Sequence, residues 1–471
     1  MPINSLLYPS NVFVPTAYNV DNSCRFNDGS SDHMFKTASA GNRRTFTFST
    51  WFKRGQLSTN QQFFTSYSAA NAGGFAYMQL EAPESGVIGD RISLEVYGTI
   101  LLKTNQVLRD PSSWYNLVIA VDTTSGTANN RCRMYLNGTE ITSFATRNNP
   151  DQNFDFAYNQ NSVDLVLGSN NYGGNKGNYF DGYLAETVWI DGTQYAASDF
   201  GEFDDSGIWK PIDVSGLTFG TNGFYLDFEN SGALGADVSG NTNNFTVNNL
   251  TAIDQSTDTC TNNFATINPL NVNPANTNTF SEGNLKAVLN GEGTTSTMAM
   301  ASGNWYMEYK CSGNITQWTG VEEINSLISL QYSSATKSVA LYVGGATMYV
   351  NGANQGSGGY GSGWSSGDIG MIAFDADNAR VYFGKNGGWW NGSSYGASSP
   401  STYVTATTGK TYYFRFVKGG NTTCDYEVNF GGTQSFAISS GNTDGNGYGN
   451  FEYAVPSGYY ALNTKNLAEY G

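Results

Sequence analysis

The chain has few of the residues on which most enzymatic and metal chemistry depends. It contains one histidine, His33, and five cysteines that are widely spaced, so that no Cys-x-x-Cys motif occurs. Four ligands for zinc are therefore hard to assemble. A Ser-His-Asp device would need His33, which lies in a polar stretch without a Gly-x-Ser-x-Gly elbow. The odd number of scattered cysteines predicts free thiols rather than a disulfide framework.

Basic residues are also scarce, with 23 Lys and Arg against 39 Asp and Glu and a net charge of −16. Binding to a nucleic-acid duplex needs clusters of Lys and Arg. The densest basic runs, at residues 43–44 and 131–133, form no such patch, so we expect no nucleic-acid partner. The acidic surface leaves room for calcium, for example at Asp204 and Asp205, but no EF-type loop is present. The sequence predicts no dedicated metal site and no other cofactor.

Long apolar runs are absent as well. No stretch reaches 18 apolar residues, so we expect no membrane insertion. Residues 1–15 lack the basic and continuous apolar regions of a secretion signal. The sequence therefore predicts synthesis and folding in a cytoplasm.

What the chain has in abundance is glycine (56), tyrosine (30) and phenylalanine (28), with aromatics at 14% and charged residues at 13%. This mixture favours short strands with aromatic faces and polar turns. A length of 471 residues is too great for one compact core. We therefore predict an all-β protein of two antiparallel β-sandwich or jelly-roll domains.

Alternating apolar residues mark the strands of both halves. Residues 45–51 and 115–121 alternate in the first half, and Asn137-Gly138 between two such runs predicts a tight hairpin. Residues 184–190 alternate into Asp191-Gly192, a second hairpin signal. In the second half, residues 367–384 are typical of a hairpin.

The predicted organisation has four parts. Residues 1–18 form an N-terminal arm without strand alternation, and residues 19–231 form the first domain. Residues 232–300, rich in Asn, Thr and Asp, form a connector on the surface, with short edge strands as one option. Residues 301–471 form the second domain.

The first domain resembles a concanavalin A-like jelly roll of the laminin-G type. The segments that carry this resemblance are residues 24–29, 44–55, 114–118, 134–138 and 180–186. The calcium ligands of laminin-G domains cannot be matched residue by residue, so none is transferred to this chain.

The second domain resembles a SPRY domain, through residues 367–375, 381–387, 412–414 and 428–431. SPRY domains are β-sandwiches that bind partners through loops at one edge, and the resemblance implies such binding here.

The tandem as a whole resembles structural proteins of marine tailed phages, through residues 207–211, 221–228, 262–266 and 280–285. Such proteins are fibre, appendage or head-decorating parts of a particle. The resemblance implies a virion component, built after synthesis in the host cytoplasm and in contact with other virion proteins. Fibre proteins are commonly trimeric, which makes a homotrimer one expectation, although no heptad run enforces it.

Aromatic residues in glycine-rich segments are the candidate ligand-binding residues. A ring on such a loop can offer a flat apolar face to a sugar, with Asn and Ser as hydrogen-bond partners. The alternative is that these rings fold back and cap the sandwich ends. The candidates are Tyr360, Trp364, Trp389, Trp390 and Tyr395.

The alternative of a glycan hydrolase on the same fold needs two carboxylates on either side of a sugar bond. No Glu-x-Asp-x-x-Glu run occurs. The nearest substitute, Glu186 with Asp191, lies five residues apart and so on opposite faces of a regular strand. We therefore predict no catalytic residues and no enzyme activity.

The predicted function is a non-catalytic tail fibre or appendage protein that recognises a host cell-surface glycan or protein, with glycan as the leading ligand. Many weak contacts would be multiplied by copy number. The first alternative is a capsid-decorating or connector protein without a receptor role, and the second is the glycan hydrolase.

Overall fold

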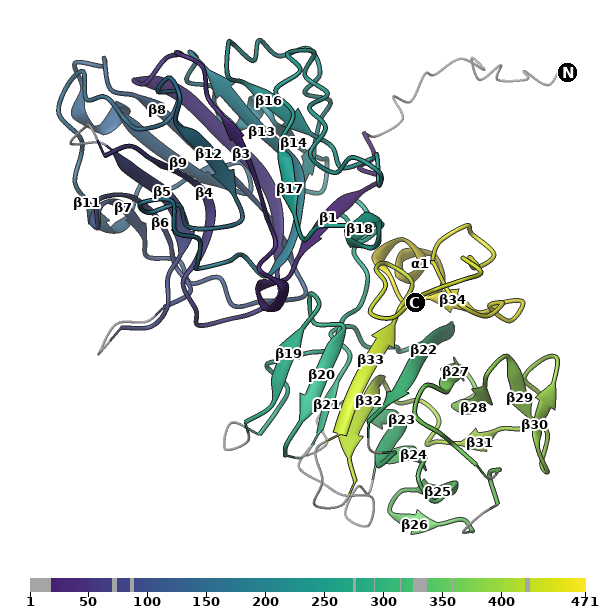
Figure 1. Cartoon of the computed structure of the whole chain (residues 1–471). Helices are drawn as coiled ribbons and strands as arrows, with labels where there is room; N and C mark the ends of the chain where they lie inside the picture. Colours follow the sequence, from purple (N-terminus) through teal and green to yellow (C-terminus); the bar gives the residue numbers. More distant parts are fainter. Residues whose placement is uncertain are drawn as a thin grey trace, which may run out of the picture.

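The computed structural model describes residues 18–69, 74–84, 89–273, 277–291, 293–313, 315–324, 337–356, 359–361, 363–419 and 424–471. Apart from Tyr18, the N-terminal arm predicted over residues 1–18 lies outside them. The described chain is built almost entirely of antiparallel sheets, with one α-helix, α1 (Thr464–Tyr470), at its C-terminal end. Figure 1 shows two separate β bodies with α1 near their junction. The all-β prediction is confirmed.

The first sandwich has two sheets of eight strands each among the described residues. Sheet A contains, in spatial order, β10 (Thr139–Glu140), β9 (Cys132–Leu136), β8 (Trp114–Asp122), β3 (Thr45–Arg54), β13 (Gly182–Asp191), β1 (Ser23–Phe26) and β18 (Gln255–Ser256), with β16 (Phe224–Leu226) beside β13. Sheet B contains β11 (Phe144–Arg147), β7 (Thr99–Thr104), β6 (Ile92–Val96), β5 (Phe75–Leu80), β4 (Gln61–Tyr67), β12 (Asp164–Leu167), β2 (His33–Thr37) and β17 (Thr246–Asn248). A separate hairpin pairs β14 (Gly201–Phe203) with β15 (Trp209–Pro211). Short 3-10 turns lie at η1 (Asp28–Ser30), η2 (Ala128–Asn130), η3 (Ala197–Asp199) and η4 (Ala252–Asp254).

The alternation of the sequence explains how these strands pack. In β3, Phe46, Phe48 and Phe52 point into the core between the sheets and are fully buried, as the two-residue period of a strand requires. The turn between β9 and β10 has positive φ at both Asn137 (46°) and Gly138 (76°), which is the type I′ geometry predicted for it.

The second hairpin signal was wrong. Asp191 ends β13, and the next strand, β14, pairs with β15 rather than with β13. The carboxylate of Asp191 is instead buried, and it accepts hydrogen bonds from the backbone amides of Asn42 (2.7 Å) and Asn222 (3.0 Å). These bonds tie two distant loops to the strand end.

The second sandwich has a large sheet and a smaller one. The large sheet contains β19 (Thr279–Ser281), β20 (Lys286–Leu289), β33 (Cys424–Asn429), β22 (Asn304–Ser312), β27 (Ile369–Asp375), β28 (Arg380–Lys385), β29 (Gly388–Trp390) and β30 (Tyr395–Ala397), with β31 (Val404–Thr405) beside β28 and β34 (Tyr460–Ala461) parallel to β22. The smaller sheet contains β21 (Gly293–Thr295), β32 (Tyr412–Lys418), β23 (Gln317–Glu323), β24 (Ser338–Tyr342), β25 (Thr347–Val350) and β26 (Ala353–Asn354). The hairpin predicted within residues 367–384 is the β27–β28 pair.

Residues 232–300, predicted as a surface connector with short edge strands as one option, contain strands that pair at the edges of both sandwiches. Strands β17 and β18 complete the two sheets of the first sandwich, whereas β19, β20 and β21 begin the second. The backbone groups of these short strands find their partners at sheet edges, where a strand on its own would leave them without hydrogen bonds.

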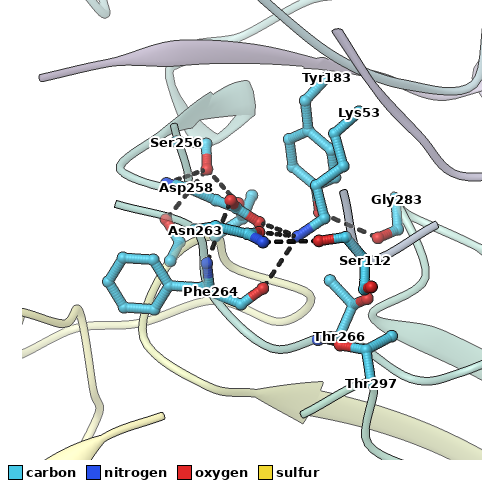
Figure 2. Close-up of polar contacts among 12 residues, drawn as sticks. Lys53, Ser112, Tyr183, Ser256, Asp258, Asn263, Phe264, Thr266, Gly283 and Thr297 are labelled. Carbon is cyan, nitrogen blue, oxygen red and sulfur yellow. Dashed lines mark hydrogen bonds and ion pairs between the residues drawn. The ribbon is translucent and has the colours of Figure 1, made fainter. Parts of the chain in front are cut away.

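Polar contacts join the two sandwiches. Figure 2 shows Lys53, at the end of β3, pointing toward Asp258, Asn263 and Phe264. Its fully buried Nζ donates to Asp258 Oδ2 (2.7 Å), Asn263 Oδ1 (2.7 Å) and the carbonyl of Phe264 (2.8 Å). Phe264 itself packs in the second sandwich. The interface is therefore fixed by directional bonds as well as by packing.

The five cysteines are free, as predicted, and four of them are buried. His33 differs from the expected polar turn, because it begins β2, is largely buried, and lies 2.9 Å from the carbonyl of Ser31 through Nδ1. Among the described residues, no helix has the length and apolar character needed to cross a membrane.

Candidate functional site

Four of the five predicted binding aromatics come together in the second sandwich. The ring of Tyr360 lies 5.5 Å from that of Trp390, and Tyr395 lies 5.2 Å from Trp390 and 5.6 Å from Trp364 between centroids. Trp364 and Trp390 are only 8% and 5% exposed, and the two tyrosines are half-buried. These rings stack mainly on one another, in the manner of a capping cluster.

Trp389 lies apart from the other four. It follows the alternation of β29, so it points away from Trp390 and packs against Tyr306, with 6.2 Å between ring centroids. It is 3% exposed. The five residues stay a predicted binding set, and the structure shows four of them as one packed cluster and the fifth on the other face of the sheet.

A groove on the outer face of sheet B offers a more open site. We call it the polar groove. It encloses about 420 Å³ over β4, β5, β6 and β7, and side chains from the loop after β12 form one wall. Its principal polar side chains are Gln62, Gln79, Glu81, Glu95, Lys103 and Asn170.

The alternation of β5 and β6 creates this groove. Ala76, Met78 and Leu80 point into the core, so the intervening residues of β5 must point outward. On β6 the same rule places Glu95 outward between core residues. A row of polar and aromatic side chains thus covers the solvent face of the sheet.

Glu95 is the centre of the groove's hydrogen bonds. Its carboxylate accepts from Tyr77 Oη (2.7 Å), Gln79 Nε2 (2.7 Å) and Ser93 Oγ (2.6 Å). Gln62 Nε2 donates in turn to Gln79 Oε1 (3.3 Å). The Oε1 atom of Gln62 is buried and has no hydrogen-bond partner among the described residues. A buried acceptor of this kind gains from a donor supplied by a ligand or by water.

A second carboxylate, Glu81, lies in the same groove and forms an ion pair with Lys103 at 2.6 Å. Burial raises the pKa of Glu81, and the ammonium of Lys103 opposes that rise. Burial likewise raises the pKa of Tyr77, with Glu95 adding to the effect.

Aromatic rings flank the groove on one side. Tyr172 is 50% exposed, and its ring lies 5.1 Å from both Tyr67 and Phe75. Tyr97, 42% exposed, lies 6.4 Å from Phe75. Exposed rings supported from below by other rings are suited to lie flat against the apolar face of a sugar.

Sequence reasoning missed the polar groove because it searched for aromatics in glycine-rich loops. The available signal was the strand alternation of residues 75–80, in which Phe, Tyr and Gln alternate with Ala, Met and Leu. That pattern predicts one buried face and one polar, aromatic face.

The sites weighed for catalysis and for metals lie elsewhere. Glu186 is buried and accepts from Tyr18 Oη (3.0 Å) and Tyr225 Oη (2.7 Å), and burial raises its pKa to about 7. Asp204 pairs with Lys210 and accepts two backbone amides of its own turn. Within the described part of the chain, no three His, Cys, Asp or Glu side chains gather as metal ligands would.

Residues 28–197 match the family model described as the concanavalin A-like lectin/glucanases superfamily. This segment contains most of sheets A and B, and with them all the strands of the polar groove. No curated protein matches the chain.

Three solved structures are similar to parts of the chain. A putative carbohydrate binding protein from Bacteroides ovatus is 15% identical, with a TM-score of 0.36 over 50% of this chain and 60% of that one. The SPRY domain of human HERC1 is 15% identical, with a TM-score of 0.24 over 31% and 87%. A heptameric pentraxin from Limulus polyphemus is 15% identical, with a TM-score of 0.28 over 38% and 80%.

Proposed function

We propose that the chain is a non-catalytic glycan-binding protein and that the glycan lies in the polar groove. The observation that carries this proposal is the combination, in one open groove, of a hydrogen-bonded Glu95 network with the exposed ring of Tyr172. Sugars present hydroxyl groups at their edges and C–H groups on their faces. Carboxylate and amide groups bind the edges, and rings bind the faces.

The match of residues 28–197 to a model of lectins and glucanases supports the same ligand class. Among these two activities, binding fits the groove better. Glycoside hydrolysis needs one carboxyl group free to donate a proton and a second to act as base or nucleophile. Of the three carboxylates that line the groove, Glu95 accepts from three donors and Glu81 forms an ion pair with Lys103. Among the described residues only Glu84 is left unpaired, where the reaction needs two such groups.

We extend the proposal to the setting in which binding occurs. The resemblance of the tandem to structural proteins of marine tailed phages supports a tail fibre or appendage that contacts other virion proteins and a host-surface glycan, in a virion completed in the host cytoplasm. A homotrimer would present several grooves at once, and linked sites gain avidity without any new contact. A capsid-decorating or connector role is the alternative, and it requires no ligand in the groove.

The test is binding of the purified chain to a glycan array and then titration of the best ligand. Replacing Tyr172 by Ala is expected to weaken binding about fivefold to tenfold, since a lost ring contact is worth about 1 kcal/mol. The control is Phe203→Ala, because Phe203 is 52% exposed on the β14–β15 hairpin and does not line the groove. Equal binding by wild type and Tyr172→Ala would remove the groove from the proposal, and no binding to any glycan would favour the decorating role.

The hydrolase is the second candidate, because three carboxylates, Glu81, Glu84 and Glu95, line the groove. It predicts release of reducing ends from a polysaccharide and loss of that release in Glu81→Gln. We expect no release by the wild-type chain under conditions in which it binds the same polysaccharide.

A further inference from the structure

The interface between the two sandwiches brings three chemically reactive groups into contact. Lys53 Nζ lies 2.7 Å from Asn263 Oδ1 and 2.7 Å from Asp258 Oδ2. Because a carbonyl bond is about 1.2 Å long, Nζ lies no more than about 3.9 Å from the side-chain carbonyl carbon of Asn263. An amine, an amide carbon and a carboxylate are thus within reach of one another, as Figure 2 shows.

The surroundings of these three groups exclude water and so favour a reaction among them. The Lys53 side chain is 0% exposed and that of Asp258 is 2% exposed. Burial lowers the pKa of Lys53, although the carboxylate of Asp258 opposes the effect, so the unreactive ammonium form is less favoured than in water. The second oxygen of Asp258 accepts from Trp114 Nε1 (3.0 Å), which holds the carboxylate in place.

We propose that Lys53 and Asn263 form an intramolecular isopeptide bond, with Asp258 as the catalytic group that moves the protons. The bond would connect the first sandwich to the second across 210 positions of the chain. This inference rests on the interface and is independent of the proposed function.

The reaction needs no oxidant, metal or cofactor. Asp258 takes a proton from the Lys53 ammonium, and the freed nitrogen lone pair attacks the side-chain carbonyl carbon of Asn263. Asp258 then gives a proton to Asn263 Nδ2, the bond from carbon to Nδ2 breaks, and ammonia leaves. The new amide nitrogen loses its extra proton through Asp258. Overall, one ammonium and one primary amide give one secondary amide and one ammonium ion. Fixing amine and amide together supplies most of what such a reaction needs.

Two other lysine–asparagine pairs in the same chain provide an internal comparison. Lys465 Nζ donates to Asn19 Oδ1 (2.6 Å) and Lys176 Nζ donates to Asn171 Oδ1 (2.7 Å). The first pair is exposed to solvent and the lysine of the second is half-buried, and among the described residues neither lysine forms an ion pair with a carboxylate. Only the Lys53 pair combines contact, burial and a proton carrier, so only it is expected to react.

The test is the intact mass of the full chain, purified and then denatured. We expect a mass lower than that of the sequence by one ammonia, and tandem mass spectrometry of a proteolytic digest should show a branched peptide that joins Lys53 to Asn263. Because a succinimide at Asn137-Gly138 would give the same loss of mass, the branched peptide is the deciding observation. Its absence overturns the proposal, whatever the intact mass.

Substitutions test whether these residues carry out the reaction. Asn263→Ala and Asp258→Asn are expected to abolish the branched peptide, whereas Asn19→Ala, at the solvent-exposed pair, should leave it unchanged. Asn263→Asp should still give the wild-type cross-linked peptide, now with loss of water in place of ammonia. A branched peptide that persists in Asp258→Asn at the wild-type rate would overturn the role of Asp258.

Discussion

The two sandwiches treat their outer sheet faces differently. In the first, the outer face of β5 and β6 is open and forms the polar groove around Glu95. In the second, the outer face of β22 carries Glu308, but residues 442–471, here called the C-terminal segment, lie over it. Glu308 accepts from Tyr306 Oη (2.9 Å) and from the backbone amides of Glu452 (2.9 Å) and Tyr453 (2.8 Å).

Glu95 and Glu308 show the difference between a sheet face that can bind a ligand and one that is covered by another segment of the same chain. Glu95 takes its hydrogen bonds from side chains of its own sheet, which leaves the space above it free for a ligand. Glu308 accepts two of its hydrogen bonds from the backbone of the segment that covers it, so its carboxylate is not open to a ligand. The second sandwich has covered the outer face of its large sheet, whereas the first has left the outer face of sheet B open. This difference is why we place the ligand in the first sandwich.

Weakening the contact of the C-terminal segment with β22 should have the largest effect on the free energy of unfolding. Phe451, from the C-terminal segment, is fully buried, and its ring lies 5.0 Å from that of Tyr306. Phe451→Ala is expected to lower the free energy of unfolding by about 3 to 5 kcal/mol, as for other buried rings. Tyr172→Ala, on the open face, should cost less than about 1 kcal/mol, because Tyr172 is half exposed. Urea unfolding of the two variants measures this difference, and equal losses would mean that the groove is a covered surface too.

Much of the fold could be predicted from the sequence because its strands alternate locally. The runs at residues 45–51 and 115–121 became β3 and β8, and Asn137-Gly138 formed its hairpin, since each of these signals is decided by neighbours in sequence. The cover over Glu308 depends instead on a parallel pairing of β34 with β22, in which Trp305 lies opposite Tyr460. No local pattern specifies a pairing between segments so far apart.

The candidate site was less predictable. Trp364 and Trp390 lie in glycine-rich sequence, which suggested exposed rings, yet both are buried against other aromatics. Glycine reports backbone freedom and says nothing about where a neighbouring ring packs. The lysine–asparagine contact across the interface was equally hidden, because Lys53 and Asn263 meet only after both sandwiches have formed.

The next largest effect is expected in the pH dependence of stability, because Glu308 on the covered face of the second sandwich titrates with a raised pKa. Burial raises the pKa of Glu308 from 4.5 to about 7, and the hydrogen bonds from Tyr453, Glu452, Tyr306 and Asn429 only partly oppose it. The folded protein therefore holds this proton more tightly than the unfolded chain does. Well below pH 4.5 Glu308 is protonated in both states and costs nothing, and its cost grows as the pH rises to about 7, to about 3 kcal/mol in all.

Urea unfolding at pH 5 and pH 8, in wild type and in Glu308→Gln, measures this cost. The loss of stability between the two pH values should be smaller in the variant by about 2 kcal/mol. Glu186, whose pKa burial also raises to about 7, contributes the same slope to both proteins and cancels in the difference. An identical loss in both proteins would show that Glu308 is not the titrating group.

The smallest effect on stability is expected at the open face, from Glu95→Gln. The hydroxyls of Tyr77 and Ser93 can rotate toward the remaining carbonyl oxygen or toward water, so the expected loss is about 1 kcal/mol or less. At pH 5, where ionisation of Glu308 costs little, Glu308→Gln should cost more, because the backbone amides that face it cannot turn away. Ligand binding should show the reverse order. Glu95→Gln weakens glycan binding about tenfold, because the amide can no longer accept every hydrogen bond that holds Tyr77 and Gln79 in place in the groove, a loss of about 1.4 kcal/mol, whereas Glu308→Gln leaves binding unchanged. Titration of one glycan with both variants measures this order, and a loss of binding in Glu308→Gln alone would move the site to the second sandwich.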